Sequence, residues 1–378
     1  MRVGLGEAFK DDPIGEASAR AVIGRVYAAR HRVADAESEL RRALELTNKH
    51  IGRETGEASD ILEPLASMRY DAGEYAKAEE LYRKVLAIRE VVDGPEHSNT
   101  LVARSNLILA MEGRGALADA AREYRSLLEV ERRVLGDSDT TTLATTHNLA
   151  GVLHNLGRYQ EAAGVEEKVL HARLDLDPDT RDPDALGCMN LYARCLQSLK
   201  RFDDAEKWYR RCLVRRRDRF GADDQFTLNT QTNLAALLVE MKQLTEAETL
   251  ARDACARRAA RFGEDDPGLL LDRHTLAVAL REEGKLVEAL GIAADISIRA
   301  GKTQLDRTKL AVMEINHGRI FTGLKRFEEA RTILVSCVEE LEKTDVGRAR
   351  LGEARAALFE LFAAWGRPEE AEKYRDSK

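Results

Sequence analysis

Asparagine side chains recur on one face of the stretch THNLAGVLHNLGRYQEA, in a part of the sequence that reads as helical. The leucines of this stretch form the apolar stripe of a helix, whereas Asn148 and Asn155 lie seven residues apart on another face. Asparagine is an indifferent helix former, because its side chain competes for backbone partners. Its amide is both donor and acceptor, so it can satisfy a peptide unit in both senses. These residues therefore suggest recognition by hydrogen bonds.

Other chemistry has weaker signals. His147 and His154 also lie seven residues apart, but no third ligand is evident, so we interpret them as polar surface residues rather than a metal site. The acidic loops GDSDT, DPDTRD, GADD and GEDD lack the spacing and closing glutamate of an EF-hand and read as capping loops. The sequence has no Gly-rich phosphate loop and no GxSxG motif. We expect no catalytic residues, no metal and no cofactor, and hence no enzyme.

Composition narrows the class of protein further. The 378 residues are 44% hydrophobic and 33% charged, with a formal net charge of -7. No apolar run approaches the roughly 20 residues of a membrane-spanning helix, so we expect a cytoplasmic protein without a membrane partner. The acidic balance disfavours nucleic acid as a partner. The basic run RRCLVRRRDRF (210–220) is expected to lie on the convex side and to pair with acidic loops, with a phosphate or nucleic-acid patch as the less favoured alternative.

The cysteines carry no motif. Their number is odd and none forms a CxxC pair, which disfavours a disulfide framework. We interpret them as reduced structural thiols. They are Cys188, Cys195, Cys212, Cys255 and Cys337.

A unit of about 42 residues repeats along the whole chain and must position these side chains. The segment GRYQEA at 157 has counterparts whose starts differ by 41 to 43 residues, which gives nine units. Each unit reads as helix, tight turn, helix and longer turn. The segments begin at 31, 73, 115, 157, 200, 242, 284, 325 and 366.

Small residues mark the turns of each unit. The turn residue is Gly in five units, where a left-handed cap conformation is free of steric cost, and His31 or lysine elsewhere at some strain. Alanine follows five residues later in all nine units and lets the two helices approach closely. A second Gly or a Pro ends most of the second helices, and threonine is then expected as the N-cap of the next unit. The lysines are Lys200, Lys242 and Lys325; the threonines are Thr100, Thr142 and Thr227.

Turn, alanine and period together resemble the tetratricopeptide repeat family, and more narrowly its 42-residue kinesin light chain-like variety. The segments that carry the resemblance are GPEHSNTL (94–101), TTHNLAGVLHNLGRYQEA (145–162) and TQTNLAALLVEMKQLTEAETL (230–250). The resemblance implies an all-α fold, a right-handed α-solenoid of helix pairs whose first helices line a concave groove. We expect one solenoid domain over 1–378 with a short, charged capping unit at its end, whereas residues 1–11 show no clear helix pattern. The units are about 14–55, 56–98, 99–140, 141–182, 183–225, 226–267, 268–307, 308–347 and 348–378.

The resemblance also assigns a side to the asparagines. The position nine residues before the turn faces the groove in such repeats, where asparagine commonly binds the backbone of an extended peptide; here it is asparagine in four of nine units. The alternative, that these amides bond to an adjacent helix or face water, stays open. The site does not reproduce the paired Lys/Arg clamp for a C-terminal carboxylate, which is disfavoured. The expected groove residues are Asn106, Asn148, Asn155, Asn190, Arg194, Asn229, Asn233, His147, His274, Asn316, Arg319, Asp60 and Glu63.

These observations favour a non-catalytic scaffold or adaptor that binds a protein or peptide partner in the concave groove. A ligand- or signal-peptide-sensing regulatory module is the alternative, and self-assembly through solenoid ends is a third hypothesis. The sequence leaves the oligomeric state open, a monomer included.

Overall fold

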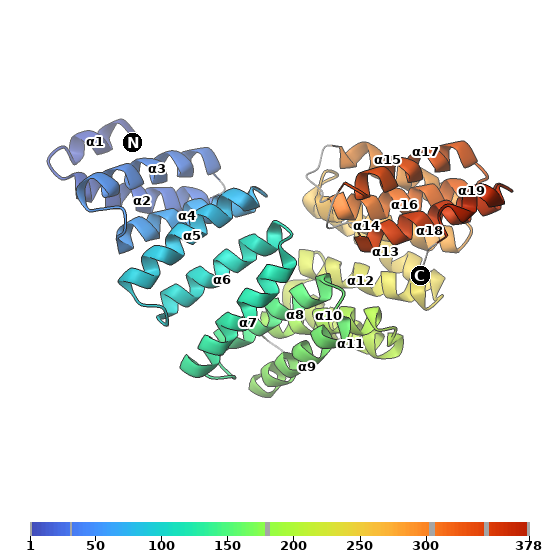
Figure 1. Ribbon diagram of the computed structural model, residues 1–378, viewed down its shortest axis with the longest axis horizontal. Coiled ribbons are helices and arrows are strands. Elements are labelled where there is room, and N and C mark those ends of the chain that lie inside the picture. The colour runs from blue at the N-terminus through green and yellow to red at the C-terminus, as the bar shows by residue number, and fades with distance from the viewer. Residues whose placement is uncertain (1, 31, 178–181, 302–306, 344–347, 376–378) are drawn as a thin grey trace. The chain divides into compact units, whose positions relative to one another are not determined.

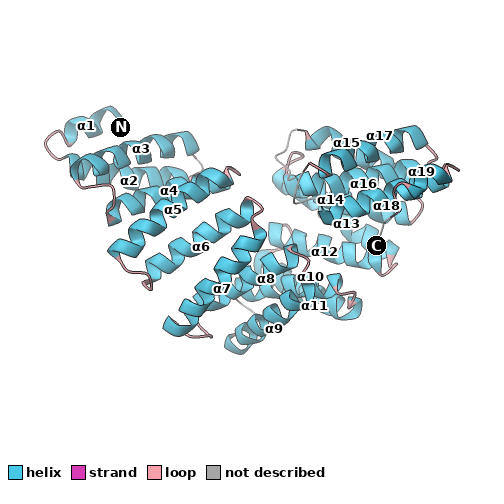
Figure 2. Ribbon diagram, in the orientation of Figure 1, coloured by secondary structure: helices cyan, strands magenta, loops and turns pink. Residues whose placement is uncertain are grey.

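Helices make up almost all of the computed structural model, which describes residues 2–30, 32–177, 182–301, 307–343 and 348–375. Within these ranges nineteen helices and no strand occur, which confirms the expected all-α solenoid class (Figures 1 and 2). The helices are α1 (Arg2–Ala8), α2 (Pro13–Ala29), α3 (Val33–His50), α4 (Gly56–Asp71), α5 (Tyr75–Val92), α6 (Ser98–Gly113), α7 (Leu117–Val134), α8 (Thr140–Asn155), α9 (Tyr159–Leu176), α10 (Pro183–Ser198), α11 (Phe202–Phe220), α12 (Gln225–Glu240), α13 (Leu244–Phe262), α14 (Pro267–Glu282), α15 (Leu286–Ala300), α16 (Arg307–Gly323), α17 (Phe327–Leu341), α18 (Arg348–Ala364) and α19 (Pro368–Glu372).

From α2 onward the even-numbered helices are the first helices of the repeats and the odd-numbered ones are the second helices. The expected short final unit is present, since its second helix, α19, has only 5 residues. The first eleven residues differ from expectation, because Arg2–Ala8 forms a helix. Its sequence, RVGLGEA, has two glycines and no apolar period, so no pattern announced it.

The chain divides into two compact units, residues 1–172 (unit 1) and 173–378 (unit 2), and each is described by itself. In unit 1, one core cluster joins Ala21, Leu40, Ala43, Ile61 and Leu65, which come from α2, α3 and α4. Each cluster thus uses side chains of consecutive helices, as expected for a solenoid whose repeats bury their apolar faces only against neighbours. Among the described helices, none combines the length and apolar character needed to cross a bilayer.

The tight turns follow the expected chemistry. In unit 1, Gly73 has φ 73° and accompanies two bonds of a Schellman motif, Gly73 N–H to the Tyr70 carbonyl and Glu74 N–H to the Arg69 carbonyl. Lys200, Lys242 and Lys325 hold φ values of 62°, 62° and 58°, so a side chain occupies the left-handed region as predicted. His31 lies outside the described residues.

The alanine five residues after the turn is buried in every unit. The first eight are fully buried and the ninth, Ala371, is 3% exposed. Because a larger side chain there would push the two helices apart, this column confirms the expected close approach. The column is Ala36, Ala78, Ala120, Ala162, Ala205, Ala247, Ala289, Ala330 and Ala371.

The expectation that threonine caps the first helices is wrong. The N-caps of α6, α8 and α12 are His97, Asp139 and Asp224, so those helices begin two residues before each threonine. The Thr100 hydroxyl instead donates to the Gly94 carbonyl at 2.7 Å. Asp139 and Asp224 cap α8 and α12 because a carboxylate accepts backbone N–H bonds next to the positive end of the helix dipole, and at α6 the Nδ1 of His97 accepts from the Asn99 N–H.

The partners of the basic run also differ from expectation. Arg210 pairs with Glu206 of its own helix, α11, and with Glu246 of α13, not with a loop. The side chain of Arg210 thus reaches an acid 36 positions later, on the next second helix. The described cysteines are free, as expected; four are buried and Cys255 is half-buried.

Candidate functional site

Two side-chain hydrogen bonds of the same kind join successive first helices, and each involves an asparagine nine residues before a turn. In unit 1, Nδ2 of Asn106 on α6 donates to Oε1 of Glu63 on α4 at 3.1 Å. In unit 2, Nδ2 of Asn233 on α12 donates to Oδ1 of Asn190 on α10 at 3.2 Å. Both pairs are partly buried and 43 residues apart. Within each unit, we call the surface of the first helices that carries its pair the asparagine face; in unit 1 this face includes Asn148.

In both contacts the asparagine amide bonds to an adjacent helix, which is the alternative that the sequence left open. The contacts nevertheless leave other donors and acceptors of these amides unused. A primary amide has two N–H donors and two acceptor sites, and each contact uses one group of each partner. The remaining groups can bind a second partner. The site residues thus stay a prediction, with a geometry that fixes where the amides are held.

The other expected residues of unit 1 are held in different ways. Nδ1 of His147 lies 2.7 Å from Oε1 of Glu166 on α9, a fully buried carboxylate, so this ring is tied to a second helix. Asn148 interacts with the Tyr124 hydroxyl of α7, and Asn155 is exposed at the last residue of α8. These side chains do not form one continuous seam.

Acidic groups accompany the asparagine face in unit 1. Asp60 on α4 is paired with Arg89 of α5. Glu112 on α6, which sequence reasoning missed, is half-buried, and burial raises the pKa of its carboxyl while the nearby His147 lowers it. Little in the sequence indicated Glu112, since a single glutamate near the end of a helix is usually exposed to solvent.

Unit 2 holds the expected cations. Arg194 on α10 is half-buried beside the Tyr209 ring, and within the described residues no ion pair engages it. Arg319 on α16 is matched by Glu360 of α18, with Nε–Oε2 at 3.0 Å. Asn229 is exposed and accepts a bond from Nη2 of Arg258 at 2.8 Å, so its amide oxygen is engaged by α13.

His274 and Asn316 line hollows of unit 2. A hollow of about 220 Å³ between α12 and α14 is lined by His274 together with residues such as Ala236, Glu240 and Val278. A second hollow of about 250 Å³, between α14, α15 and α16, is lined by His274 and Asn316. His274 is half-buried and Asn316 is 4% exposed. Both residues thus line the hollow between α14, α15 and α16.

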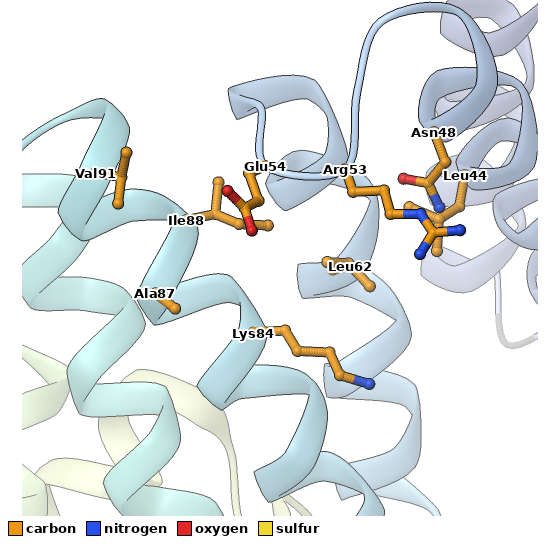
Figure 3. A pocket seen from close by; sticks show the side chains of 9 residues that line it. All are labelled: Leu44, Asn48, Arg53, Glu54, Leu62, Lys84, Ala87, Ile88 and Val91. Carbon is orange, nitrogen blue, oxygen red and sulfur yellow. The ribbon is translucent and has the colours of Figure 1, made fainter.

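A larger hollow of about 510 Å³ lies in unit 1 between α3, α4 and α5. Figure 3 shows the charged side chains of Arg53 and Lys84 on either side of Leu62. Val91 at its edge is 77% exposed, and Lys84 is already paired with Glu80. Most of its lining comes from second helices and their loop, so this hollow belongs to a different surface from the asparagine face.

Comparison with known proteins agrees with the repeat and the helix pairs. Models described as tetratricopeptide repeat match residues 57–130, 142–174 and 185–260. The chain carries tetratricopeptide repeats. Its 42-residue period resembles that of the kinesin light chain-like repeats. The tetratricopeptide repeat fold generally serves as a non-catalytic scaffold.

Solved structures share this tetratricopeptide fold at low identity. The apo form of the quorum sensor NprR from B. thuringiensis has a TM-score of 0.64 at 14% identity, over 95% of this chain and 97% of that one. The apo form of RapI has a TM-score of 0.59 at 12% identity, over 95% of both chains. A putative kinesin light chain repeat protein of Podosopora anserina has a TM-score of 0.46 at 22% identity, over 54% of this chain and 96% of that one. Curated proteins give no sequence match.

Proposed function

We propose that this chain is a non-catalytic, cytoplasmic scaffold or adaptor that binds an extended peptide or a partner domain along the asparagine face. The observation that carries the proposal is the repeated contact, Asn106 with Glu63 and Asn233 with Asn190. Each contact holds a half-buried amide in one orientation, and the amide keeps donors and acceptors for a peptide unit. A pre-oriented group loses less side-chain entropy on binding than a mobile one.

Hydrogen bonds alone are too weak for this function. Four bonds of roughly 0.5–1.5 kcal/mol each give a few kcal/mol, short of the roughly 8 kcal/mol of micromolar binding. Charges on the asparagine face supply specificity. Glu63 and Glu112 favour a basic residue in a peptide bound to unit 1, and Arg194 favours an acidic residue in a peptide bound to unit 2.

Selection from a library of linear peptides tests the proposal. The immobilised chain is used to enrich peptides, and each is re-measured on the Asn106→Ala, Asn148→Ala, Asn233→Ala triple variant. We expect the enriched peptides to lose at least tenfold in affinity. The matched control is Asn99→Ala, an exposed asparagine in the first turn of α6. Peptides that bind a folded triple variant as tightly as the original chain would sink the proposal.

A second candidate function is a ligand- or signal-peptide-sensing regulatory module. The fold shared with the quorum sensor NprR over most of both chains favours it, although at 14% identity the likeness concerns the fold. Small-angle scattering separates the two candidates. A sensor changes its dimensions when its ligand is added, whereas a scaffold binds its peptide with unchanged dimensions.

A further inference from the structure

A hollow of about 250 Å³ lies between α14, α15 and α16 of unit 2, three helices that pack against one another (Figure 1). Most of its lining is apolar, with Ile296, Leu310 and Met313 among the larger side chains. An apolar cavity of this kind stays empty or takes an apolar guest. Polar groups in its wall therefore need an explanation.

Two polar atoms of this wall have no hydrogen-bond partner among the residues that the structure describes. They are Nδ1 of His274 and Oδ1 of Asn316, both with almost no solvent exposure. The whole Asn316 residue is only 4% exposed. Buried polar groups in folded proteins are nearly always hydrogen-bonded, and an unpaired one lowers stability. Because both atoms belong to residues that line the same cavity, one guest can pair with both.

The charges around the cavity decide what kind of guest fits. Glu314, the carboxylate in the wall, is already held by Arg307 through two contacts of 3.3 and 3.1 Å. Burial, assisted by Arg281 and Arg350, lowers the pKa of His274 to about 4, so its ring is neutral at pH 7. A charged guest would lose its hydration without gaining a free counter-charge. A neutral group with both a donor and an acceptor matches the amide of Asn316 and the neutral imidazole of His274.

We propose that this cavity binds a primary carboxamide on a short alkyl chain, with the amide held by Asn316 and His274 and the chain against Ile296, Leu310 and Met313. Two sources share this chemistry, a free alkyl amide and the side chain of a glutamine in a bound peptide. His274 also lines the hollow between α12 and α14, so the cavity adjoins a surface that a peptide can reach. Binding of a free amide does not depend on the proposed scaffold function.

Three probes of equal chain length test the proposal: pentanamide, pentanoate and 1-aminopentane, measured by saturation-transfer NMR and calorimetry at pH 7. We expect pentanamide to bind at least tenfold more tightly than the acid or the amine. Equal affinities for the three, or no binding of any probe or of the peptides below, would overturn the proposal. A cavity that holds only ordered water, which no probe displaces, would do the same.

Two variants locate the site. Asn316→Leu keeps the branched shape of the side chain and removes the unpaired oxygen, so it should weaken pentanamide binding at least tenfold while thermal stability stays equal or rises. Ala300→Leu, at another lining residue, fills the cavity and should also abolish binding. Unchanged binding by a folded Asn316→Leu variant would contradict the assignment.

A peptide arm distinguishes the two sources. Acetyl-Ala-Gln-Ala-amide is compared with the same peptide carrying norleucine, which lacks the side-chain amide. Preference for the glutamine peptide that disappears in Asn316→Leu supports a peptide as the source. Binding of pentanamide without such preference supports a free amide.

Discussion

The side-chain amides of Asn190 and Asn233 lie 3.2 Å apart, on first helices that are one repeat apart in unit 2. Asn106 and Glu63 stand in the same relation in unit 1. A polar residue on the face of one helix is thus satisfied by its counterpart 43 residues earlier. The hydrogen bond satisfies polar side chains at a half-buried position that leucine could also occupy.

The Asn190–Asn233 pair should contribute measurably to stability. Asn233→Ala is expected to lower the free energy of unfolding by about 1 kcal/mol, because it removes one partly buried hydrogen bond and leaves Asn190 without it. A double-mutant cycle with Asn190→Ala, measured by urea unfolding, should give an interaction of about 0.5–1.5 kcal/mol. Strictly additive losses would show that the two amides do not interact.

The left-handed lysines should be sites where glycine stabilises the chain. Lys325 has φ 58°, and no ion pair engages it within the described residues. Lys325→Gly removes the clash of Cβ in that conformation and is expected to raise the free energy of unfolding by roughly 0.5–1 kcal/mol. The matched control is Gly284→Ala at the same turn position, φ 82°, which should lower stability by about 1 kcal/mol. A loss of stability in Lys325→Gly would contradict this account.

Glu131 on α7 should make unit 1 sensitive to pH. Its side chain is fully buried, one oxygen accepts a bond from the Thr145 hydroxyl at 3.1 Å, and the other has no hydrogen-bond partner within the described part of the chain. Burial raises the pKa of Glu131 to about 7; the Thr145 bond and Arg104 act against this shift, and Asp139 adds to it. The folded state therefore holds this proton up to about pH 7, whereas an unfolded chain releases it near pH 4.5.

The sign of the effect follows from these two values. The contribution of Glu131 to stability is complete below pH 4.5 and falls as the pH rises to about 7, because the unfolded state loses the proton first. Glu131→Gln stays neutral, so at pH 8 it should be more stable than the original chain by about 2 kcal/mol, and nearly equal at pH 4. Unfolding curves at both pH values check this. The same difference at pH 4 and pH 8 would exclude a titrating Glu131.

Replacement of Arg258 on α13 should strongly lower the free energy of unfolding, because its charged side chain is buried. Its side chain is 4% exposed and its Nε lies 2.6 Å from Oδ2 of Asp272, which is 1% exposed. Arg258→Met leaves this carboxylate without its cation and should cost roughly 3–5 kcal/mol of the free energy of unfolding. The neighbouring Arg257, with partly exposed partners Asp223 and Asp253, is the control and should cost less than about 1 kcal/mol when changed to Met.

A double variant separates the pair from simple loss of packing. Arg258→Met with Asp272→Leu replaces both charges by apolar groups and should recover most of the stability lost in Arg258→Met. The measurement is again the midpoint of urea unfolding. Failure of the second change to restore any stability would show that the first one acts through packing alone.

The sequence by itself determined the elements and their turns. A glycine at the turn indicates a left-handed backbone angle, and an alanine at a fixed place indicates a close helix contact. Both features are local and recur from unit to unit, so they could be predicted without a structure. The turn lysines and the buried alanine column are such cases. The tetratricopeptide repeat and the all-α class followed from the same local regularities.

The partners of the polar side chains were decided only by the tertiary structure. His147 looked like a surface residue, yet it contacts the buried Glu166, and the threonine expected to cap α6 bonds back to a carbonyl before that helix. Arg173, Arg216 and Arg258 each lie 16 residues after a turn start and are buried, which their charge alone did not suggest. The partner of His147 lies on another helix of the stack, and that of the threonine lies in the loop before α6. Which side chains meet therefore depends on the register in which the helices pack, and no local period of the sequence encodes it.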